Sequence, residues 1–240
     1  MELPKIDLPT YDVKIPSTGK EIKVRPFTVK EEKLLLMAVE SKNPNEIIQT
    51  VKQIINNCIV SGKFDVNKAP FYDVDFLFIY LRAKSMGDSV DINLTCKNVV
   101  DGVECGNVFP AKLNIANAVI EKDDSISNKI ELTNTTGVKM TYPTYDVMKR
   151  MESNNSVDVK SSIIAASIES IYDEKGVYKS SDYKFEQLKE FVEGLTEEKF
   201  RVLEKYVDNF PSFAVELKEK CTKCGFEHNV RYKDFYDFFF

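Results

Sequence analysis

The chain has 240 residues and a net charge of −5, from 33 basic and 38 acidic residues, which disfavours binding to nucleic acid through the overall electrostatic field. No apolar run approaches the length of a membrane span, and the polar N-terminal residues predict no signal peptide. We therefore expect protein partners rather than a membrane or nucleic acid, and hydrophobic residues, at 43 % of the chain, permit a core in one or two domains.

Residues 11–27 are predicted to form a β-hairpin. Apolar residues alternate on both sides of Pro16-Ser17-Thr18-Gly19, a segment with the composition of a turn. A helix follows to about Glu40, because Thr28 and Glu31 have the spacing of a capping box. The N-terminal part of the chain therefore combines a hairpin with a helix.

Two more helices are expected in the N-terminal region. The first spans residues 45–59, and Cys58 lies on its apolar stripe, so we interpret it as a core residue. The second begins near Pro70 and is apolar on most sides, which predicts a central position. We interpret Asp73 and Asp75 as solvated side chains or as charges that favour the start of this helix.

Strands and helices alternate along the rest of the chain. Residues 90–94 and 213–217 alternate in hydropathy and lead into Cys96 and Cys221, and a further hairpin is predicted over residues 130–140. Helices are predicted at residues 145–151, 159–176, 185–192 and 197–207, the last with Thr196 as N-cap.

Two cysteine pairs carry the clearest chemical signal. Cys221 and Cys224 form a Cys-x2-Cys-Gly knuckle, and Cys96 and Cys105 form a looser pair with eight intervening residues, also followed by glycine. Thiolates suit zinc, which prefers four tetrahedral ligands, and glycine permits a positive φ after the second cysteine. We predict one structural zinc per chain, held by these four residues. Buried thiols, or a thiol oxidoreductase using Cys221 and Cys224, are the alternatives, and the sequence does not fix which cysteines share a metal.

The single histidine, His228, is a second candidate ligand. It follows Cys224 by four residues and would replace Cys96 or Cys105. We favour an exposed strand residue beside the knuckle, because the cysteine pairs alone complete a tetrahedral site. The chain has neither a glycine-rich phosphate loop nor residues around His228 that resemble a nucleophile system. We therefore expect no enzyme activity.

The C-terminal run from Tyr232 onward is dense in aromatic residues. Large side chains gain about 1.5–3 kcal/mol each on burial, so such a run is costly in water. Either it completes the core of this chain or it docks into a groove on a partner. The candidate partner-binding residues are Phe235, Tyr236, Phe238, Phe239 and Phe240.

The predicted fold class is α+β. It consists of a helical body with an N-terminal β-hairpin, and a β-rich module resembling a zinc ribbon that joins the middle of the chain to its C-terminus. We expect three parts: residues 1–89, hairpin and helices; residues 90–142 with 211–240, the four-cysteine module; and residues 143–210, a helical insertion.

Several separated segments resemble one phage protein family. They are Leu8–Tyr11, Ile15–Gly19, Val24–Phe27, Lys30–Leu36, Phe78–Gly87 and the paired cysteine motifs. The family comprises the baseplate hub proteins of T-even-type contractile-tailed phages (myoviruses), including the hub assembly chaperones. The resemblance implies a virion-assembly role without catalytic residues, with hub and tail proteins as partners. It also implies a location in the host cytoplasm during assembly or in the tail baseplate of the virion, and leaves open whether the protein is a chaperone or a permanent subunit.

The sequence alone also admits a different class, a zinc-ribbon adaptor that binds nucleic acid or the transcription machinery. Cysteine knuckles are common in such proteins. The acidic balance of the chain, and the lack of a basic and aromatic patch around Cys221, count against this reading. The oligomeric state is not predicted by any of these patterns.

Overall fold

The computed structural model describes residues 6–147 and 159–233. Helices and antiparallel sheets both contribute, which confirms the α+β class. The chain forms two compact units, with Met1–Val66, Tyr72–Glu121 and Ser212–Phe240 in the first and Asn67–Phe71 with Lys122–Pro211 in the second. The three-part domain division expected from the sequence stays a prediction, because compactness does not test independent folding. None of the helices in the described parts has the length and hydropathy of a membrane span.

The first unit begins with a three-stranded antiparallel sheet in the order β1-β2-β3. Strands β1 (Tyr11–Lys14) and β2 (Glu21–Val24) form the predicted hairpin, and Gly19 takes a φ of 67° in the turn between them. The third strand, β3 (Ile59–Ser61), lies where the sequence predicted the end of a helix. Pairing with β2 extends the chain there as soon as the helix ends at Cys58.

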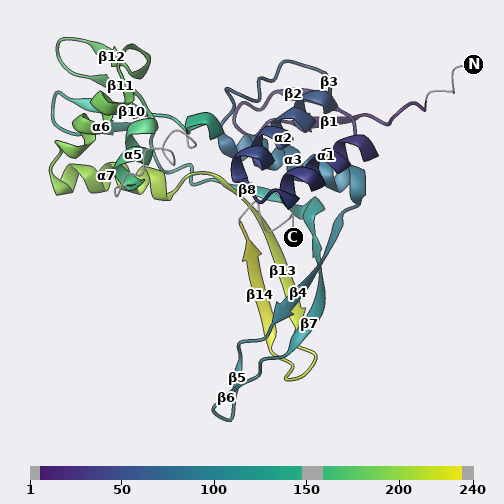
Figure 1. Cartoon of the computed structure of the whole chain (residues 1–240). Helices are drawn as coiled ribbons and strands as arrows, with labels where there is room; N and C mark the ends of the chain where they lie inside the picture. The colour runs from purple at the N-terminus through teal and green to yellow at the C-terminus, as the bar shows by residue number, and fades with distance from the viewer. Residues whose placement is uncertain (1–5, 148–158, 234–240) are drawn as a thin grey trace, which may run out of the picture. The chain divides into compact units, whose positions relative to one another are not determined.

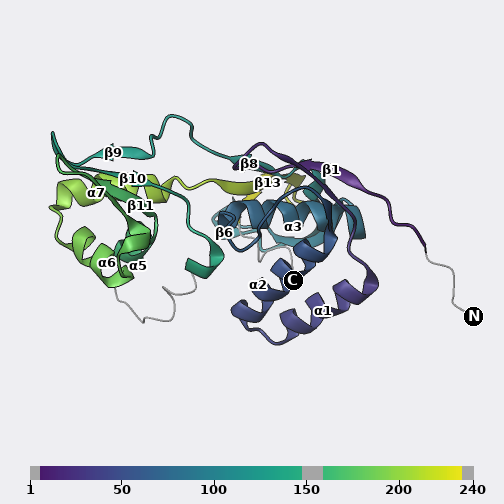
Figure 2. The same cartoon turned by 90° about the horizontal axis from the view of Figure 1, so that it is seen from above.

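Three helices pack with this sheet in the first unit (Figure 2). They are α1 (Val29–Glu40), α2 (Pro44–Cys58) and α3 (Phe71–Met86). The predicted central position of α3 is confirmed, because Val74, Leu77 and Leu81 are completely buried. Its apolar residues occupy nearly all sides, as a helix surrounded by other elements requires.

The interpretation of Asp73 and Asp75 as solvated side chains is wrong, since both residues are buried, whereas the alternative position at the helix start holds for Asp73, which lies in the first turn of α3. The carboxylate of Asp73 accepts a hydrogen bond from the backbone N–H of Ser17 (2.9 Å) and another from the Ser17 hydroxyl. Burial raises the pKa of Asp73, and these hydrogen bonds partly offset that effect. The carboxylate thus fixes the turn of the N-terminal hairpin against α3, a contact that sequence spacing does not reveal.

Two long hairpins complete the first unit (Figure 1). One pairs β4 (Ser89–Thr95) with β7 (Val108–Asn114), and the other pairs β13 (Ser212–Lys220) with β14 (Glu227–Tyr232). A 3-10 turn over Ile115–Asn117 leads from β7 to β8 (Val119–Glu121), which pairs with the start of β13. The apolar side chains shared between the hairpins are buried, and they include Leu94, Phe109, Leu113, Phe213, Val215 and Leu217.

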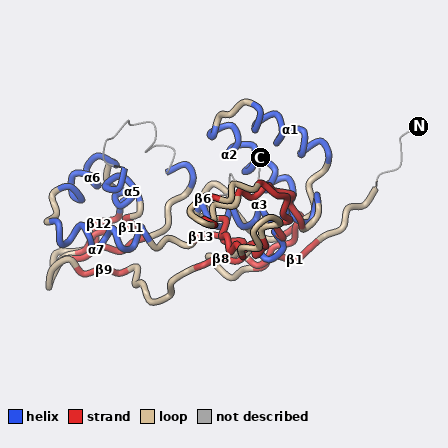
Figure 3. Tube along the Cα trace, turned by 90° about the horizontal axis from the view of Figure 1, so that it is seen from below, coloured by secondary structure: helices blue, strands red, loops and turns tan. Residues whose placement is uncertain are grey.

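The second unit contains a four-stranded antiparallel sheet in the order β12-β11-β10-β9. Its strands are β9 (Lys129–Glu131), β10 (Gly137–Met140), β11 (Ile168–Tyr172) and β12 (Val177–Lys179). One face packs against α5 (Val159–Ala166), α6 (Phe185–Glu193) and α7 (Glu197–Asp208), which lie together on one side of the sheet (Figure 3). The hairpin predicted over residues 130–140, and the last two helices, are confirmed.

The predicted helix over residues 159–176 is wrong in its second half. The helix ends at Ala166, and Ile168–Tyr172 instead forms β11, paired with β10. The spacing of Ile168 and Ile171 fits a helical stripe, but β-branched side chains also suit a strand, and pairing with a distant hairpin decides between them. The backbone N–H of Thr141 donates to the carbonyl of Ser167 (2.7 Å) at this change of structure.

The helix predicted over residues 145–151 is described only in part. Residues 145–147 are helical, and the remainder lies outside the described residues.

A charged pair joins the N-terminal hairpin to α1. The carboxylate of Glu31, whose side chain is 7 % exposed, accepts two hydrogen bonds from the guanidinium of Arg25 (2.8 and 3.0 Å). It also accepts one from the backbone N–H of Thr28 (2.7 Å), which confirms the predicted capping box. The Arg25 hydrogen bonds, opposed by burial and aided by Thr28, lower the pKa of Glu31 from 4.5 to about 2.

We expect Glu31→Gln to lower the free energy of unfolding by about 2 kcal/mol at neutral pH, since it removes the charged partner of Arg25. Because the folded pKa of Glu31 lies below the unfolded value, this contribution is complete above about pH 4.5 and is lost as the pH falls toward 2. Urea denaturation at several pH values measures it. The control is Glu32→Gln, on the same helical turn without these hydrogen bonds, and an equal loss in both variants would contradict the assignment.

Candidate metal centre

Four cysteines from the two long hairpins meet in the first unit. The sulfur atoms of Cys96, Cys105, Cys221 and Cys224 all lie within 4.8 Å of one another. The Sγ atoms of Cys96 and Cys224 are 3.6 Å apart, and those of Cys105 and Cys221 are 3.9 Å apart. Tetrahedral coordination with zinc–sulfur bonds of 2.3 Å requires sulfur separations of about 3.8 Å. The four thiols therefore fit a single tetrahedral metal ion.

Strand pairing brings the first cysteine of each pair to the end of its hairpin. Cys96 directly follows β4, and Cys221 directly follows β13, which pair with β7 and β14 respectively. The second cysteines lie in the segments that lead into the return strands: Cys105 precedes β7 and Cys224 precedes β14. The sequence predicted these strands and this grouping of the two pairs, although not which sulfurs approach most closely.

The downstream knuckle, residues 221–226, closes through two backbone hydrogen bonds. The N–H of Gly225 donates to the carbonyl of Cys221 (2.9 Å), and the N–H of Cys221 donates to the carbonyl of Phe226 (2.9 Å). Gly225 has a φ of 72°, a conformation that costs glycine little. These two hydrogen bonds close the turn independently of any bond to a metal.

The upstream knuckle repeats the same two hydrogen bonds despite its longer spacing. The N–H of Gly106 donates to the carbonyl of Cys96 (2.9 Å), and the N–H of Cys96 donates to the carbonyl of Asn107 (2.8 Å). Gly106 also has a positive φ, of 60°. Cys96 and Cys105 therefore occupy the positions that Cys221 and Cys224 occupy in the downstream knuckle.

The extra residues of the upstream knuckle form a hairpin of their own, β5 (Val99–Val100) and β6 (Val103–Glu104). Asp101 and Gly102 form its turn with φ values of 51° and 81°, as in a type I′ turn. The N–H of Cys105 donates to the carbonyl of Asn98 (2.7 Å) at the base of this hairpin. The upstream motif is therefore a Cys-x2-Cys-Gly knuckle with six residues inserted before its second cysteine.

Amide groups donate hydrogen bonds to the sulfurs. The backbone N–H of Lys223 and the side-chain amide of Asn107 donate to Cys221 Sγ, at 3.4 and 3.5 Å. The side-chain amide of Asn98 donates to Cys224 Sγ at 3.7 Å. Each asparagine belongs to the upstream knuckle and contacts a sulfur of the downstream one. Sequence reasoning missed both asparagines, although each lies two residues after a cysteine.

These donors shift the acidity of the thiols. Burial raises the pKa of Cys221, but the amide donors outweigh it and lower the pKa to about 6. The backbone N–H of Phe226, followed by Asn98, lowers the pKa of Cys224. Burial instead raises the pKa of Cys96 to about 12. The downstream pair is thus prepared to supply thiolates, the form that binds metals.

His228 is not a member of the four-sulfur group. It lies on β14, and its ring centroid is 5.0 Å from that of Phe226 and 5.7 Å from that of Phe109. Its position on a strand agrees with the sequence interpretation, but the expected exposure is wrong, because the residue is half-buried between these rings. Four sulfurs complete a tetrahedral set without it.

The other sequence candidates lie apart from this site. Cys58 is completely buried on α2, as predicted, and burial raises its pKa to about 12. The aromatic residues Phe235, Tyr236, Phe238, Phe239 and Phe240 lie outside the described residues.

Comparison with protein families identifies the chain over nearly its whole length. The model of the T4 bacteriophage base plate protein family matches residues 8–240. The chain belongs to the T4 bacteriophage base plate protein family. Comparison with curated proteins and with solved structures returned no match.

Membership of the T4 bacteriophage base plate protein family has direct functional consequences. It assigns the chain a structural role in the phage baseplate and an association with the virion tail. It also implies interaction with other phage baseplate proteins. The resemblance noted from separated sequence segments is thereby confirmed at the level of T4-type baseplate proteins.

We expect deletion of Val99–Glu104 to leave metal binding intact, since the product, Cys96-Lys97-Asn98-Cys105-Gly106, has the spacing of the downstream knuckle. Cobalt(II) titration, followed by the visible absorption of tetrahedral cobalt thiolates, measures stoichiometry and affinity in the deletion variant and the wild-type chain. Deleting the same number of residues from the loop over residues 122–127, in the second unit, is the control. Loss of the tetrahedral spectrum only in the knuckle deletion would refute the equivalence of the two knuckles.

Proposed function

We propose that this protein is a non-enzymatic tail protein that acts in assembly of the baseplate hub through protein–protein contacts, braced by a structural zinc site. The family match over residues 8–240 carries the proposal, because it places the chain among baseplate proteins. The more specific role in the hub is supported by the resemblance of residues 8–36, residues 78–87 and the cysteine motifs to hub proteins. We propose that assembly takes place in the host cytoplasm, and that the tail baseplate is the destination.

Zinc is the metal that best suits the four thiols. An all-thiolate tetrahedral site is characteristic of structural zinc, and four protein ligands leave no open position for a substrate or water. Such a site stabilises the protein by joining the ends of two hairpins, one ending near residue 96 and the other near residue 221. The closed ligand set favours a structural role over metal-assisted catalysis.

The partner contacts proposed from the sequence are the C-terminal aromatic residues. Phe235, Tyr236, Phe238, Phe239 and Phe240 would supply a large apolar area to a groove on a hub or tail protein.

We expect the purified protein to contain about one zinc per chain, and Cys224→Ser to lose most of it and to melt at a clearly lower temperature. Elemental analysis and thermal denaturation measure the two effects. The control is Cys58→Ala, which removes a buried thiol at a cost of about 1 kcal/mol but no metal ligand. A wild-type chain without metal, or a Cys224→Ser variant with unchanged melting, would contradict the zinc proposal.

We expect tagged protein from phage-infected cells to capture tail-hub proteins, because hub assembly requires direct contact with them. Mass spectrometry of the captured proteins, together with the same analysis of purified virions, measures both partner and fate. Capture of hub proteins, together with absence of this protein from virions, would indicate an assembly chaperone. Capture of hub proteins, together with presence of this protein in virions, would indicate a permanent subunit. Capture of polymerase or nucleic acid in place of tail proteins would overturn the proposal.

A further inference from the structure

The four-stranded sheet of the second unit has one face that no helix among the described residues covers. On the opposite face, the side chains that pack against α5, α6 and α7 in the core include Ile130, Val138 and Met140. On the uncovered face, register pairs Lys129 with Lys139, Lys139 with Ser170, and Ser170 with Lys179. Direct cross-strand partners share a face, so three lysines form a row across all four strands. We call Lys129, Lys139 and Lys179 the lysine row.

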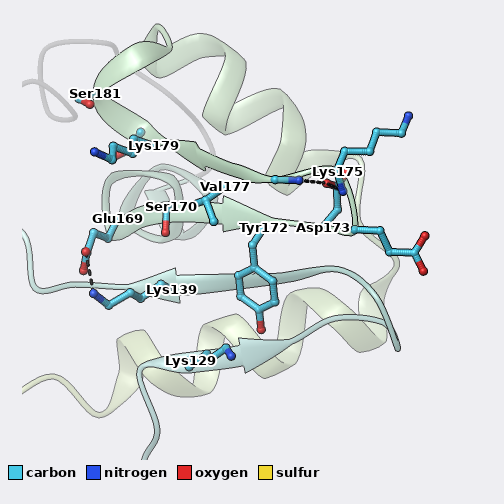
Figure 4. Close-up of a pocket in the computed structure, with 13 residues that line it drawn as sticks. Lys129, Lys139, Glu169, Ser170, Tyr172, Asp173, Lys175, Val177, Lys179 and Ser181 are labelled. Carbon is cyan, nitrogen blue, oxygen red and sulfur yellow. Dashed lines mark hydrogen bonds and ion pairs between the residues drawn. The ribbon is translucent and has the colours of Figure 1, made fainter.

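The lysine row borders an open hollow of about 800 Å³ on this face. Figure 4 shows Lys129, Lys139, Tyr172 and Lys179 on successive strands, with the helices behind the sheet. The other lining residues include Glu169, Asp173, Glu174 and Lys175. The face is therefore both accessible and concave.

The acidic residues that line the hollow are fewer than its lysines by one. Glu169 pairs with Lys139 (2.7 Å), but both side chains are about half exposed, so the pair is weak. Asp173 accepts hydrogen bonds from the backbone N–H groups of Lys175 (2.8 Å) and Gly176 (3.1 Å) in its own turn. Lys129 and Lys179 have no ion pair with any residue that the structure describes. With four lysines, Lys175 included, and the three acidic residues Glu169, Asp173 and Glu174, the lining has a formal charge of +1 on a chain whose net charge is −5.

An aromatic ring lies beside the lysine row. Tyr172 extends across β10 at Gly137, where an added Cβ would lie 2.2 Å from the tyrosine oxygen. Lys129 Nζ lies 5.0 Å from the centroid of this ring, within range of a cation–π contact. The tyrosine hydroxyl has no hydrogen-bond partner within the described residues. Because residue 137 is glycine, the ring of Tyr172 can lie over β10. The ring provides an apolar surface beside the lysine row, with the tyrosine hydroxyl at its end.

We propose that this face binds an extended acidic segment of a partner protein, with Asp or Glu at alternate positions. Three spacings between neighbouring strands separate β9 from β12 by about 14 Å. In an extended segment, residues i, i+2 and i+4 point to one side and also span about 14 Å. A segment running across the strands therefore places its outer carboxylates opposite Lys129 and Lys179 and its middle carboxylate between Lys139 and Ser170, while small side chains cover Tyr172.

The chemistry of the row favours a protein over nucleic acid as the occupant. Lysine ammonium groups pair readily with single carboxylates, whereas bidentate recognition of phosphate is typical of arginine, which the hollow does not contain. That the partner is a baseplate protein rests on the proposed function, whereas recognition of an acidic segment does not.

The test uses the full-length protein and defined synthetic probes. The first probe is a ten-residue peptide alternating Thr and Glu, and the second has the same composition with its five Glu residues consecutive. A third probe is a single-stranded oligonucleotide of equal charge. The binding variant is Lys129→Gln/Lys139→Gln/Lys179→Gln. Its charge-matched control is Lys30→Gln/Lys33→Gln/Lys63→Gln, which changes three exposed lysines of the first unit.

We expect the alternating peptide to bind the wild-type chain and the control variant equally. The lysine-row variant should bind it about tenfold more weakly, as for the loss of three exposed ion pairs. Three results would overturn the proposal. The alternating peptide could bind the lysine-row variant as tightly as the control variant, or the clustered peptide could bind the wild-type chain as tightly as the alternating one. The third result is that the alternating peptide does not bind the wild-type chain. Tighter binding of the oligonucleotide that depends on the lysine row would replace it with a nucleic-acid site. If the acidic peptide does not bind, tagged protein can still capture hub proteins from infected cells. The peptide experiment therefore tests this proposal separately from the proposed function.

Discussion

The meeting of four thiols is the contact that joins the ends of the two long hairpins of the first unit. The sulfur of Cys96 lies 3.6 Å from that of Cys224, although 128 residues separate them in the chain. The two long hairpins also share a strip of buried apolar side chains, and a metal at their ends, as proposed, would add a second restraint on their mutual position.

The similarity of the two knuckles explains how this contact is built. Each uses the same pair of backbone hydrogen bonds and a glycine with positive φ, and asparagines from one reach the sulfurs of the other. The inserted hairpin leaves these hydrogen bonds unchanged. It also exposes three valines, Val99, Val100 and Val103, beyond the site. The sequence spacing of a metal motif can therefore lengthen without a change in ligand geometry, provided the insertion is itself closed at its base.

Much of this arrangement could be predicted from the sequence, because it depends on local patterns. Alternating residues before Cys96 and Cys221 predicted the strands, and the glycines after Cys105 and Cys224 predicted the turns. The failures involve contacts between distant segments. Ile168–Tyr172 forms a strand because a remote hairpin offers a pairing edge, and the burial of Asp73 is compensated by hydrogen bonds from the distant Ser17. Periodicity within one segment carries no information about such partners.

The pairing of β8 with β13 also has a consequence for the order of folding. Glu121 and Ser212 are direct partners in this ladder, so the intervening residues leave and re-enter the first unit at one place. During synthesis, Cys96 and Cys105 emerge well before Cys221 and Cys224, and Lys122–Pro211, the larger part of the second unit, is made between them. We therefore expect the upstream thiols to remain unmatched in the nascent chain while residues 122–211 fold, so that late closure of the ribbon marks completion of the first unit.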